Sequence, residues 1–266
     1  MPNNVPMGMS EDESTGVGVR EGGTPSASPL SLGELASPAE WMSWTDSEKA
    51  WMSMRDADLL EALMVGHALA LGRPIDVLEW GAGRSTLFYS TLLQTRGLLA
   101  GWVAMEHNRE FFTAEIAPKF EQRPDRHFHL IDDGGEVEAE RLGGQEAGSV
   151  SVAVFDGGDL RPYERSADRT ADLDDYVRFP ALLGRSFDLV VVDGRKRRRC
   201  LLEASRLLSS SGIVVLHDAW RPYYECAFSE FSAGARIGDE LWVGAQHELD
   251  LRAILPGHAF EAGEEE

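Results

Sequence analysis

The segment 75–89, with the sequence IDVLEWGAGRSTLFY, constrains the fold more than any other part of the chain. An apolar run ends on an acid, Glu79, and a glycine-spaced turn (GAG) follows. A helical pattern then opens on Ser85 and Thr86, so the segment predicts a strand, a tight loop and a helix N-terminus in succession. Glycines let a backbone approach a ligand closely, and a helix start offers N–H groups. The segment therefore predicts a ligand site, with an ordinary strand-to-helix turn as the alternative.

The acid before the glycines distinguishes this loop from a dinucleotide-binding loop. A dinucleotide fold uses G-x-G-x-x-G, and Thr86 stands in place of the third glycine. Glu79 would repel a pyrophosphate, but it can accept hydrogen bonds from a cationic or hydroxyl-rich ligand. The pattern E-x-G-x-G-x-S-T resembles motif I of the class I S-adenosylmethionine (SAM)-dependent methyltransferases. This resemblance implies that Glu79, Gly81, Gly83, Ser85 and Thr86 bind SAM.

The composition fits one α/β domain with an extension. The chain has 266 residues, of which 43% are hydrophobic, enough for a full core. Its net charge of −20 argues against a nucleic-acid partner, which needs a broad basic face. The two cysteines lie in helical patterns, so neither a disulfide framework nor a zinc site is predicted. No signal peptide or membrane span stands out, and we expect a cytoplasmic protein without a membrane partner.

Local composition predicts where the folded domain lies. Residues 1–38 are rich in Gly, Ser, Pro and acids without periodicity, which predicts a disordered tail. The domain is expected over 39–260, with a helical cover at 39–73 and an acidic tail at 261–266. The acidic, glycine-rich stretch 134–172 is expected to be a variable insertion, either carrying acceptor specificity or without a role.

Strand and helix patterns alternate after the glycine loop, which predicts a doubly wound, mostly parallel α/β sheet with ligands at the carboxyl ends of the strands. The five strands are expected to begin at Ile75, Gly101, His127, Ser186 and Gly212. The later segments ELWVGAQ and ELDLRAIL are expected to form antiparallel edge strands, as the resemblance to this Rossmann-like methyltransferase family implies.

Acids end the second and third predicted strands. Glu106 follows the glycine loop by roughly twenty residues, where a ribose-binding fold places a carboxylate for two vicinal hydroxyls. Asp132 or Asp133 falls where the family often places a side chain near adenine. If the segment 150–156 is instead the third core strand, Asp156 takes this role, and the sequence leaves the choice open.

The fourth and fifth predicted strands end in VDGRK and LHDAW. This part resembles the divalent-metal O-methyltransferases, and the resemblance implies Mg²⁺ held by Asp193 and Asp218 with Lys196 as base. His217 departs from that pattern because nitrogen is a poor magnesium ligand. In the metal-free alternative, His217 or Asp218 deprotonates an acceptor hydroxyl. A further alternative is that both residues cap the next helix.

The basic run 195–199 begins beside the fourth strand end. Positive charge at a helix N-terminus opposes the helix dipole, so the run favours recognition of an anionic acceptor. Arg195, Arg221 and Tyr224 are the expected acceptor-binding residues. A solvated face that pairs with the protein's own carboxylates is the alternative.

These features together predict a SAM-dependent methyltransferase that moves a methyl group to a hydroxyl of a small molecule or saccharide. SAM is the expected cofactor, and Mg²⁺ is a second candidate. A SAM-binding scaffold without catalysis is the alternative from another functional class. A nicotinamide oxidoreductase is disfavoured by the missing third glycine and by Glu79.

Overall fold

A computed structural model of the protein describes residues 49–132, 135–143, 146–158, 160 and 170–255. The predicted tails at 1–38 and 261–266 lie outside these residues, as does the start of the predicted cover. In the described part, no helix combines the length and the hydropathy needed to cross a membrane.

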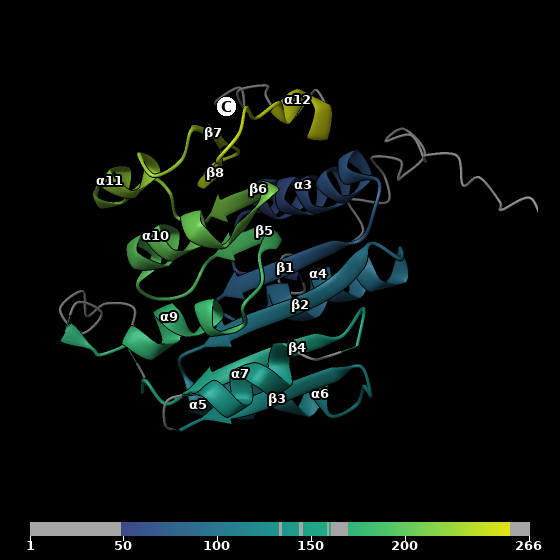
Figure 1. The fold of residues 1–266 in the computed structure, drawn as a ribbon, viewed down its shortest axis with the longest axis vertical. Helices are drawn as coiled ribbons and strands as arrows, with labels where there is room; N and C mark the ends of the chain where they lie inside the picture. Colours follow the sequence, from purple (N-terminus) through teal and green to yellow (C-terminus); the bar gives the residue numbers. More distant parts are fainter. Residues whose placement is uncertain (1–48, 133–134, 144–145, 159, 161–169, 256–266) are drawn as a thin grey trace, which may run out of the picture.

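The described residues form one eight-stranded sheet in the order β3-β4-β2-β1-β5-β6-β8-β7 (Figure 1). The strands are β1 (Ile75–Trp80), β2 (Leu99–Glu106), β3 (Arg126–Ile131), β4 (Val150–Phe155), β5 (Phe187–Val192), β6 (Leu208–Leu216), β7 (Ala233–Ile237) and β8 (Leu241–Ala245). Strands β1 to β6 pair in parallel, and β8 runs antiparallel to β6 and β7. The predicted α/β class is confirmed: a mostly parallel, doubly wound sheet with antiparallel C-terminal strands.

Two hydrophobic layers cover the sheet, because successive side chains of a strand point to opposite faces. In β1, Val77 belongs to one layer and Leu78 to the other. The first layer includes α3 (Met54–Leu71), α4 (Arg84–Thr95) and α6 (Ala117–Phe120). The second includes α7 (Glu136–Gly143), α9 (Asp174–Leu182), α10 (Arg197–Leu207) and α11 (Glu225–Phe228). Figure 1 shows α7, α9 and α10 in front of the sheet.

Ser53 and Gly72 account for the two ends of helix α3. The Ser53 hydroxyl accepts a hydrogen bond from the Asp56 N–H at 3.1 Å and caps the first turn. The helix ends at Gly72, whose φ of 65° is the left-handed conformation that glycine adopts readily. Strand β1 therefore begins shortly after a clean helix end.

Three joined helical segments connect β2 to β3. They are α5 (Arg109–Phe111), the π-helical η2 (Phe112–Ile116) and α6. Pro118 lacks the N–H that an α-helix needs at this position, which accounts for the wider turn before it.

The segment 134–172 is not only a peripheral insertion. It contains β4, which pairs with β2 on one side and with β3 on the other. All six residues of β4 are buried, as expected for a strand covered on both faces. The alternative in which 150–156 is the third core strand is therefore the observed one, and β3 is an edge strand.

Near the C-terminus, the structure differs from the prediction in the segment ELDLRAIL and in the strand that pairs with β8. The segment ELDLRAIL forms a short helix, α12 (Leu251–Ile254), because the Asp250 side chain caps it through the Arg252 N–H. The antiparallel partner of β8 is β7, which the sequence analysis missed. Helix α10 ends at Leu207, before the serine-rich stretch 209–211. This stretch belongs to β6, whose pairing with β5 has a register shift between Phe187 and Leu189. The segment at 222–228 is a 3₁₀ turn, η3 (Pro222–Tyr224), followed by α11.

Candidate active site

Four adjacent strands bring the predicted site residues to one edge of the sheet. Strands β2, β1, β5 and β6 are neighbours, with Trp80 in register with Met105 and with Val192. The pairing continues past the strand ends, because the Asp193 N–H donates to the Trp80 carbonyl at 2.9 Å and the His217 N–H to the Val192 carbonyl at 3.2 Å. The glycine loop and the residues after β2, β5 and β6 therefore share the edge where open α/β sheets bind ligands.

Glu79 is fully buried beneath the glycine loop. Its carboxylate accepts hydrogen bonds from Ser85 Oγ at 2.5 Å, Thr86 Oγ1 at 2.6 Å and Trp102 Nε1 at 3.0 Å. Burial raises the pKa of Glu79 to about 7, although these three hydrogen bonds act in the opposite direction.

These contacts change the interpretation of three predicted SAM ligands. We expected the carboxylate of Glu79 and the hydroxyls of Ser85 and Thr86 to face a ligand, but they bind one another inside the protein. Thr86 Oγ1 also accepts the Gly83 N–H at 2.9 Å. In this geometry, Glu79 holds the start of α4 to the end of β1 through Ser85 and Thr86.

The two glycines of the loop have different surroundings. A Cβ on Gly81 would lie 2.6 Å from the Gly194 nitrogen, so a neighbouring loop fills the space above Gly81. A Cβ on Gly83 would meet no atom within 4 Å. Only the second glycine therefore faces open space through which a ligand can approach the backbone.

Glu106 ends β2 beside the loop and is buried. Its Oε1 accepts the Asn108 N–H at 2.7 Å and lies 3.0 Å from His107 Nδ1. The loop is held against the same strand end, since the N–H groups of Gly81 and Ala82 donate to the Met105 carbonyl at 2.8 and 3.1 Å. The structure thus places the predicted ribose acid next to the glycine loop.

The acids considered for adenine lie at the ends of β3 and β4. Arg109 joins them, with Nη2 2.5 Å from Asp132 Oδ1 and Nη1 3.9 Å from Asp156 Oδ2. Asp133 lies outside the described residues. Because β4 separates β3 from β2, Asp156 follows the strand nearer to Glu106. The observed strand order thus favours Asp156 over Asp132 for this role.

Asp193 and His217 form a hydrogen-bonded pair across β5 and β6. Asp193 Oδ1 lies 2.8 Å from Nδ1 of the buried His217. Burial disfavours the charged imidazolium, but the hydrogen bond and charge of Asp193 outweigh it and raise the pKa of His217. Nε2 of this ring has no hydrogen-bond partner among the described residues.

Arg197 binds the two strand ends together, a role that its position in a basic run concealed. Its guanidinium donates to the Asp193 carbonyl at 3.0 Å, to the His217 carbonyl at 2.7 Å and to Asp218 Oδ2 at 2.8 Å. It also lies 3.0 Å from Asp193 Oδ1. The Arg197 side chain is largely buried, and a buried charge needs a partner. Asp193 and Asp218 balance its positive charge.

Asp218 has a backbone conformation unusual for its residue type, with φ of 57°. Its Oδ2 accepts hydrogen bonds from both Arg197 and Arg221 at 2.8 Å. Burial would raise the pKa of Asp218, but the charges of Arg197, His217 and Arg221 outweigh burial and lower it. A carboxylate held in this way is a weak base.

Glu240, in the turn between β7 and β8, joins this cluster and was not predicted. Its Oε2 lies 3.5 Å from His217 Nε2. Burial and the nearby charge of Asp218 raise the pKa of Glu240. No local signal in the sequence identifies it, because an acid in a turn is common.

The predicted magnesium ligands do not fit this metal. Asp193 and Asp218 are already paired with guanidinium groups and with the imidazole, so neither carboxylate supplies an unbalanced charge. His217, Asp218 and Glu240 do place ligand atoms within 4.8 Å of one another. One of the three ligands is nitrogen, whereas Mg²⁺ prefers an octahedron of oxygen ligands.

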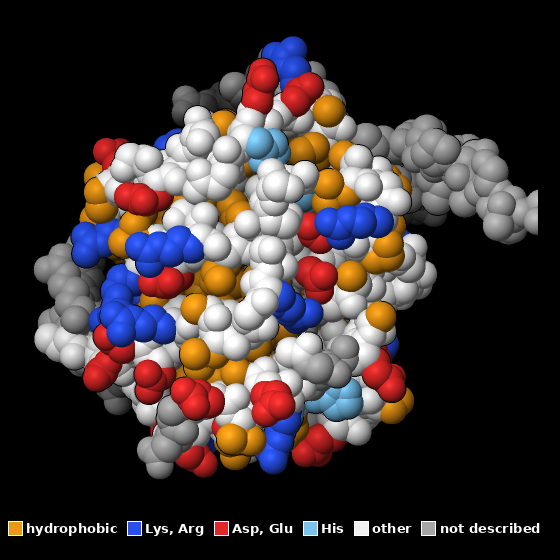
Figure 2. Space-filling model, in the orientation of Figure 1, with side chains coloured by type: hydrophobic (Ala, Val, Ile, Leu, Met, Phe, Trp, Pro, Cys, Tyr) orange, Lys and Arg blue, Asp and Glu red, His pale blue; other side chains and the backbone are white. Residues whose placement is uncertain are grey.

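The basic run does not act as one surface. Arg197 lies inside the cluster, Arg199 binds Asp174 of α9 at 2.6 Å, and Arg195 donates to the Leu160 carbonyl. Lys196 precedes α10 with φ of 53°. Figure 2 shows Lys and Arg side chains gathered beside α9 and α10, at the left of the view.

Two predicted acceptor-binding residues differ in accessibility. Arg221 lies at the rim of the cluster, next to the exposed Trp220, with its guanidinium carbon 5.2 Å from the indole ring centre. Tyr224 is buried, and its hydroxyl accepts a hydrogen bond from Tyr223. Tyr224 thus packs beneath the surface and contacts Tyr223, which is the exposed tyrosine of the two.

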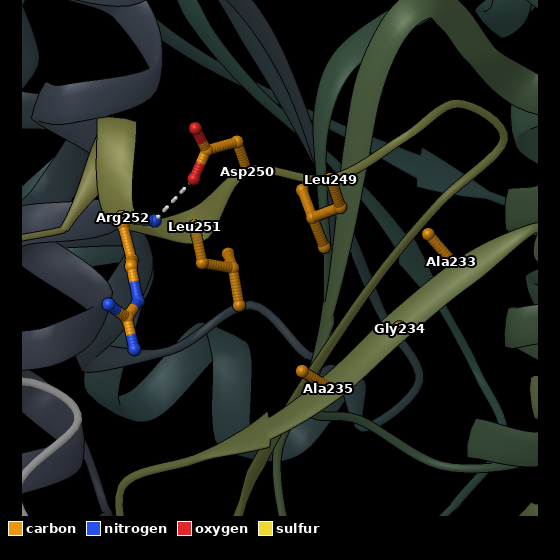
Figure 3. Close-up of a pocket in the computed structure, with 7 residues that line it drawn as sticks. All are labelled: Ala233, Gly234, Ala235, Leu249, Asp250, Leu251 and Arg252. Carbon is orange, nitrogen blue, oxygen red and sulfur yellow. Dashed lines mark hydrogen bonds between the residues drawn. The ribbon is translucent and has the colours of Figure 1, made fainter.

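A separate pocket of about 310 Å³ lies between β7 and α12 (Figure 3). It is lined by Ala233, Gly234, Ala235, Leu249, Asp250, Leu251 and Arg252. None of the predicted site residues lines it, and the Asp250 carboxylate there is engaged in capping α12.

Some solved structures are similar to this chain at low sequence identity. No family model matches the chain, and no curated protein matches it. A solved methyltransferase-like protein from Silicibacter pomeroyi is similar at 17% identity, over 78% of this chain and 97% of that chain, with a TM-score of 0.48. CalS11, a TDP-rhamnose 3'-O-methyltransferase of calicheamicin biosynthesis, is similar at 13% identity, over 73% and 80%, with a TM-score of 0.42. The 16S rRNA N2 G1207 methyltransferase of T. thermophilus is similar at 15% identity, over 74% and 44%, with a TM-score of 0.39.

With identities of 17% or less and TM-scores of 0.48 or less, these similarities assign neither cofactor nor acceptor to this chain. The three compared proteins are described as methyltransferases or as methyltransferase-like. One is an rRNA enzyme and another a sugar-nucleotide enzyme. The expectation that this chain has no nucleic-acid partner therefore stays a prediction.

Proposed function

We propose that the protein is a SAM-dependent methyltransferase that acts on a hydroxyl of a small molecule or saccharide. One observation carries the proposal: the glycine loop is hydrogen bonded to the Met105 carbonyl, one residue before Glu106. The open side of Gly83 and a carboxylate suited to ribose hydroxyls therefore lie together at adjacent strand ends.

The reaction needs alignment and removal of one proton. Bound SAM would supply an activated methyl group: the acceptor oxygen would bond to the methyl carbon, and the sulfur would keep the electron pair of the broken sulfur–methyl bond. His217 is the expected base for the acceptor proton, and Asp193 fixes the ring through Nδ1. Asp218 serves less well as the base because two guanidinium groups hold its charge.

The acceptor is expected to carry an anionic group. Arg221 lies at the rim of the cluster and is partly exposed, and further basic side chains gather beside α9 and α10. A guanidinium binds carboxylate or phosphate through paired hydrogen bonds. A uronate or a phosphorylated sugar has this chemistry.

Calorimetric titration of the protein with SAM and with NAD⁺ tests the cofactor. We expect SAM to bind and NAD⁺ not to bind. Glu106→Ala should reduce SAM affinity strongly, whereas Glu110→Ala, which removes an exposed acid nearby, should not. Binding of NAD⁺ but not SAM would overturn the proposal.

Turnover is tested separately by release of S-adenosylhomocysteine with pools of uronates, neutral sugars, phenols and RNA. Turnover with a hydroxyl acceptor supports the enzyme. Tight SAM binding without turnover in any pool would favour the scaffold alternative.

A further inference from the structure

The first turn of α3 is clasped to the turn between β7 and β8, far away in the sequence. The buried Asp56 carboxylate accepts the N–H groups of Asp239 at 2.7 Å and Glu240 at 2.9 Å. The Asp239 carboxylate in return accepts a hydrogen bond from Ser53 at 2.6 Å and lies 3.3 Å from Arg55. The start of the helix therefore fixes the position of this turn.

The turn has little freedom to shift. Gly238 has φ of 60°, and a Cβ on it would run into the Asp56 carboxylate. Burial raises the pKa of Asp56, although its two backbone hydrogen bonds act in the opposite direction. Because Asp56 is fully buried, the two backbone N–H groups replace the hydrogen bonds that its carboxylate would make with water.

The clasped turn reaches the active-site cluster. The Glu240 carbonyl accepts the Ala219 N–H at 2.7 Å, directly after Asp218. The Glu240 side chain places Oε2 3.5 Å from His217 Nε2. This side chain is 40% exposed, whereas that of His217 is 7% exposed.

We propose that Glu240 is a further residue of the active-site cluster, acting on His217 Nε2, and that Asp56 is the positioning residue that holds it there from α3. This inference rests on the proposed function for its catalytic meaning. When His217 takes a proton at Nε2, the new N–H points to Glu240, and the Nδ1–H remains on Asp193. The two carboxylates then stabilise the imidazolium from both sides, and the more exposed Glu240 passes the proton to water.

Several charged groups face His217. Asp193 from β5, Asp218 from its own strand end, Glu240 from the turn and Asp56 from α3 favour the charged ring. Arg197 from α10 opposes it, and Arg221 adds positive charge through Asp218. Loss or displacement of Glu240 alone should therefore lower the pKa of His217.

Nuclear magnetic resonance titration of the histidine imidazoles tests the inference in the full chain, with the His217 signal assigned from its loss in His217→Gln. We expect the pKa of His217 to fall in Glu240→Gln. It should also fall in Gly238→Ala, which displaces the turn without changing any charge. Glu248→Gln removes an exposed acid beyond the other end of β8 and should leave it unchanged.

Asp56→Asn keeps one acceptor oxygen, and Asp56→Ala keeps none. We expect a smaller fall of the His217 pKa in the first variant than in the second, which a general loss of stability would not produce. An unchanged His217 pKa in Glu240→Gln would overturn the role of Glu240. A fall in that variant with no change in Gly238→Ala would overturn the positioning role. The titration needs no SAM, so failure of SAM binding would count against the proposed function alone.

Discussion

Gly81 and Gly194 lie in direct backbone contact where β1 and β5 end. A methyl group on Gly81 would lie 2.6 Å from the Gly194 nitrogen, and one on Gly194 would lie 2.8 Å from the Gly81 nitrogen. Gly81 also has φ of 105°, a conformation that other residues rarely adopt. The neighbouring strand end therefore requires a glycine at position 81, whereas no described atom would meet a Cβ at position 83.

The two loop glycines should respond differently to alanine. Gly81→Ala is expected to destabilise the protein by about 2 kcal/mol or more, through a backbone clash and the positive φ. Gly83→Ala should change stability by less than about 0.5 kcal/mol but weaken SAM binding. Urea unfolding and calorimetric titration measure the two effects. Equal destabilisation by both variants would contradict this division of roles.

The buried Glu79 should make stability depend on pH. Its folded pKa of about 7 lies above its ordinary value of 4.5, so between these values the folded state holds a proton that the unfolded state has lost. The stabilisation from this proton is fully present below pH 4.5 and is lost as pH rises through 7. The loss lowers the free energy of unfolding by an amount on the order of 3 kcal/mol. We expect Glu79→Gln to remove this part of the pH dependence. If the free energies of unfolding of the two proteins changed with pH in the same way from pH 5 to 8, Glu79 would not be the source of this pH dependence.

Arg197 should be important for stability, unlike its neighbour in the same basic run. Arg197→Met leaves Asp193 and Asp218 without their shared partner, and loss of one side of a buried ion pair costs about 3–5 kcal/mol. Arg198→Met is the matched control because this side chain is exposed, and we expect a change within about 0.5 kcal/mol. Denaturant unfolding of both variants gives the comparison, and similar midpoints would refute the role assigned to Arg197.

Chelation should not abolish methyl transfer. The aspartates after β5 and β6 are neutralised by Arg197 and Arg221, so these two carboxylates do not offer Mg²⁺ an unbalanced negative charge. Activity in excess EDTA is therefore expected to equal activity without it. Loss of activity in EDTA that added Mg²⁺ restores would show that the metal interpretation of Asp193 and Asp218 is right after all.

Local sequence patterns were enough to predict the strand–loop–helix at 75–89, the alternation of strands and helices, and the acids that end β1, β2 and β5. These features are local: burial on both faces selects apolar strands, and a chain leaving the sheet brings polar residues to the strand ends. Pattern reasoning succeeds there because each signal spans only a few neighbouring residues.

Long-range contacts in the folded protein set which strands are neighbours and which polar groups meet. In the fold, β4 lies between β2 and β3, and the Glu79 carboxylate is hydrogen bonded beneath the glycine loop. The Arg197 side chain is buried against Asp218, and Glu240 lies beside His217. The clasp between Asp56 and Glu240 joins residues separated by 184 positions in the chain. Such partners are selected by strand order and by the need of buried polar groups for hydrogen bonds, and neither leaves a mark in a local pattern.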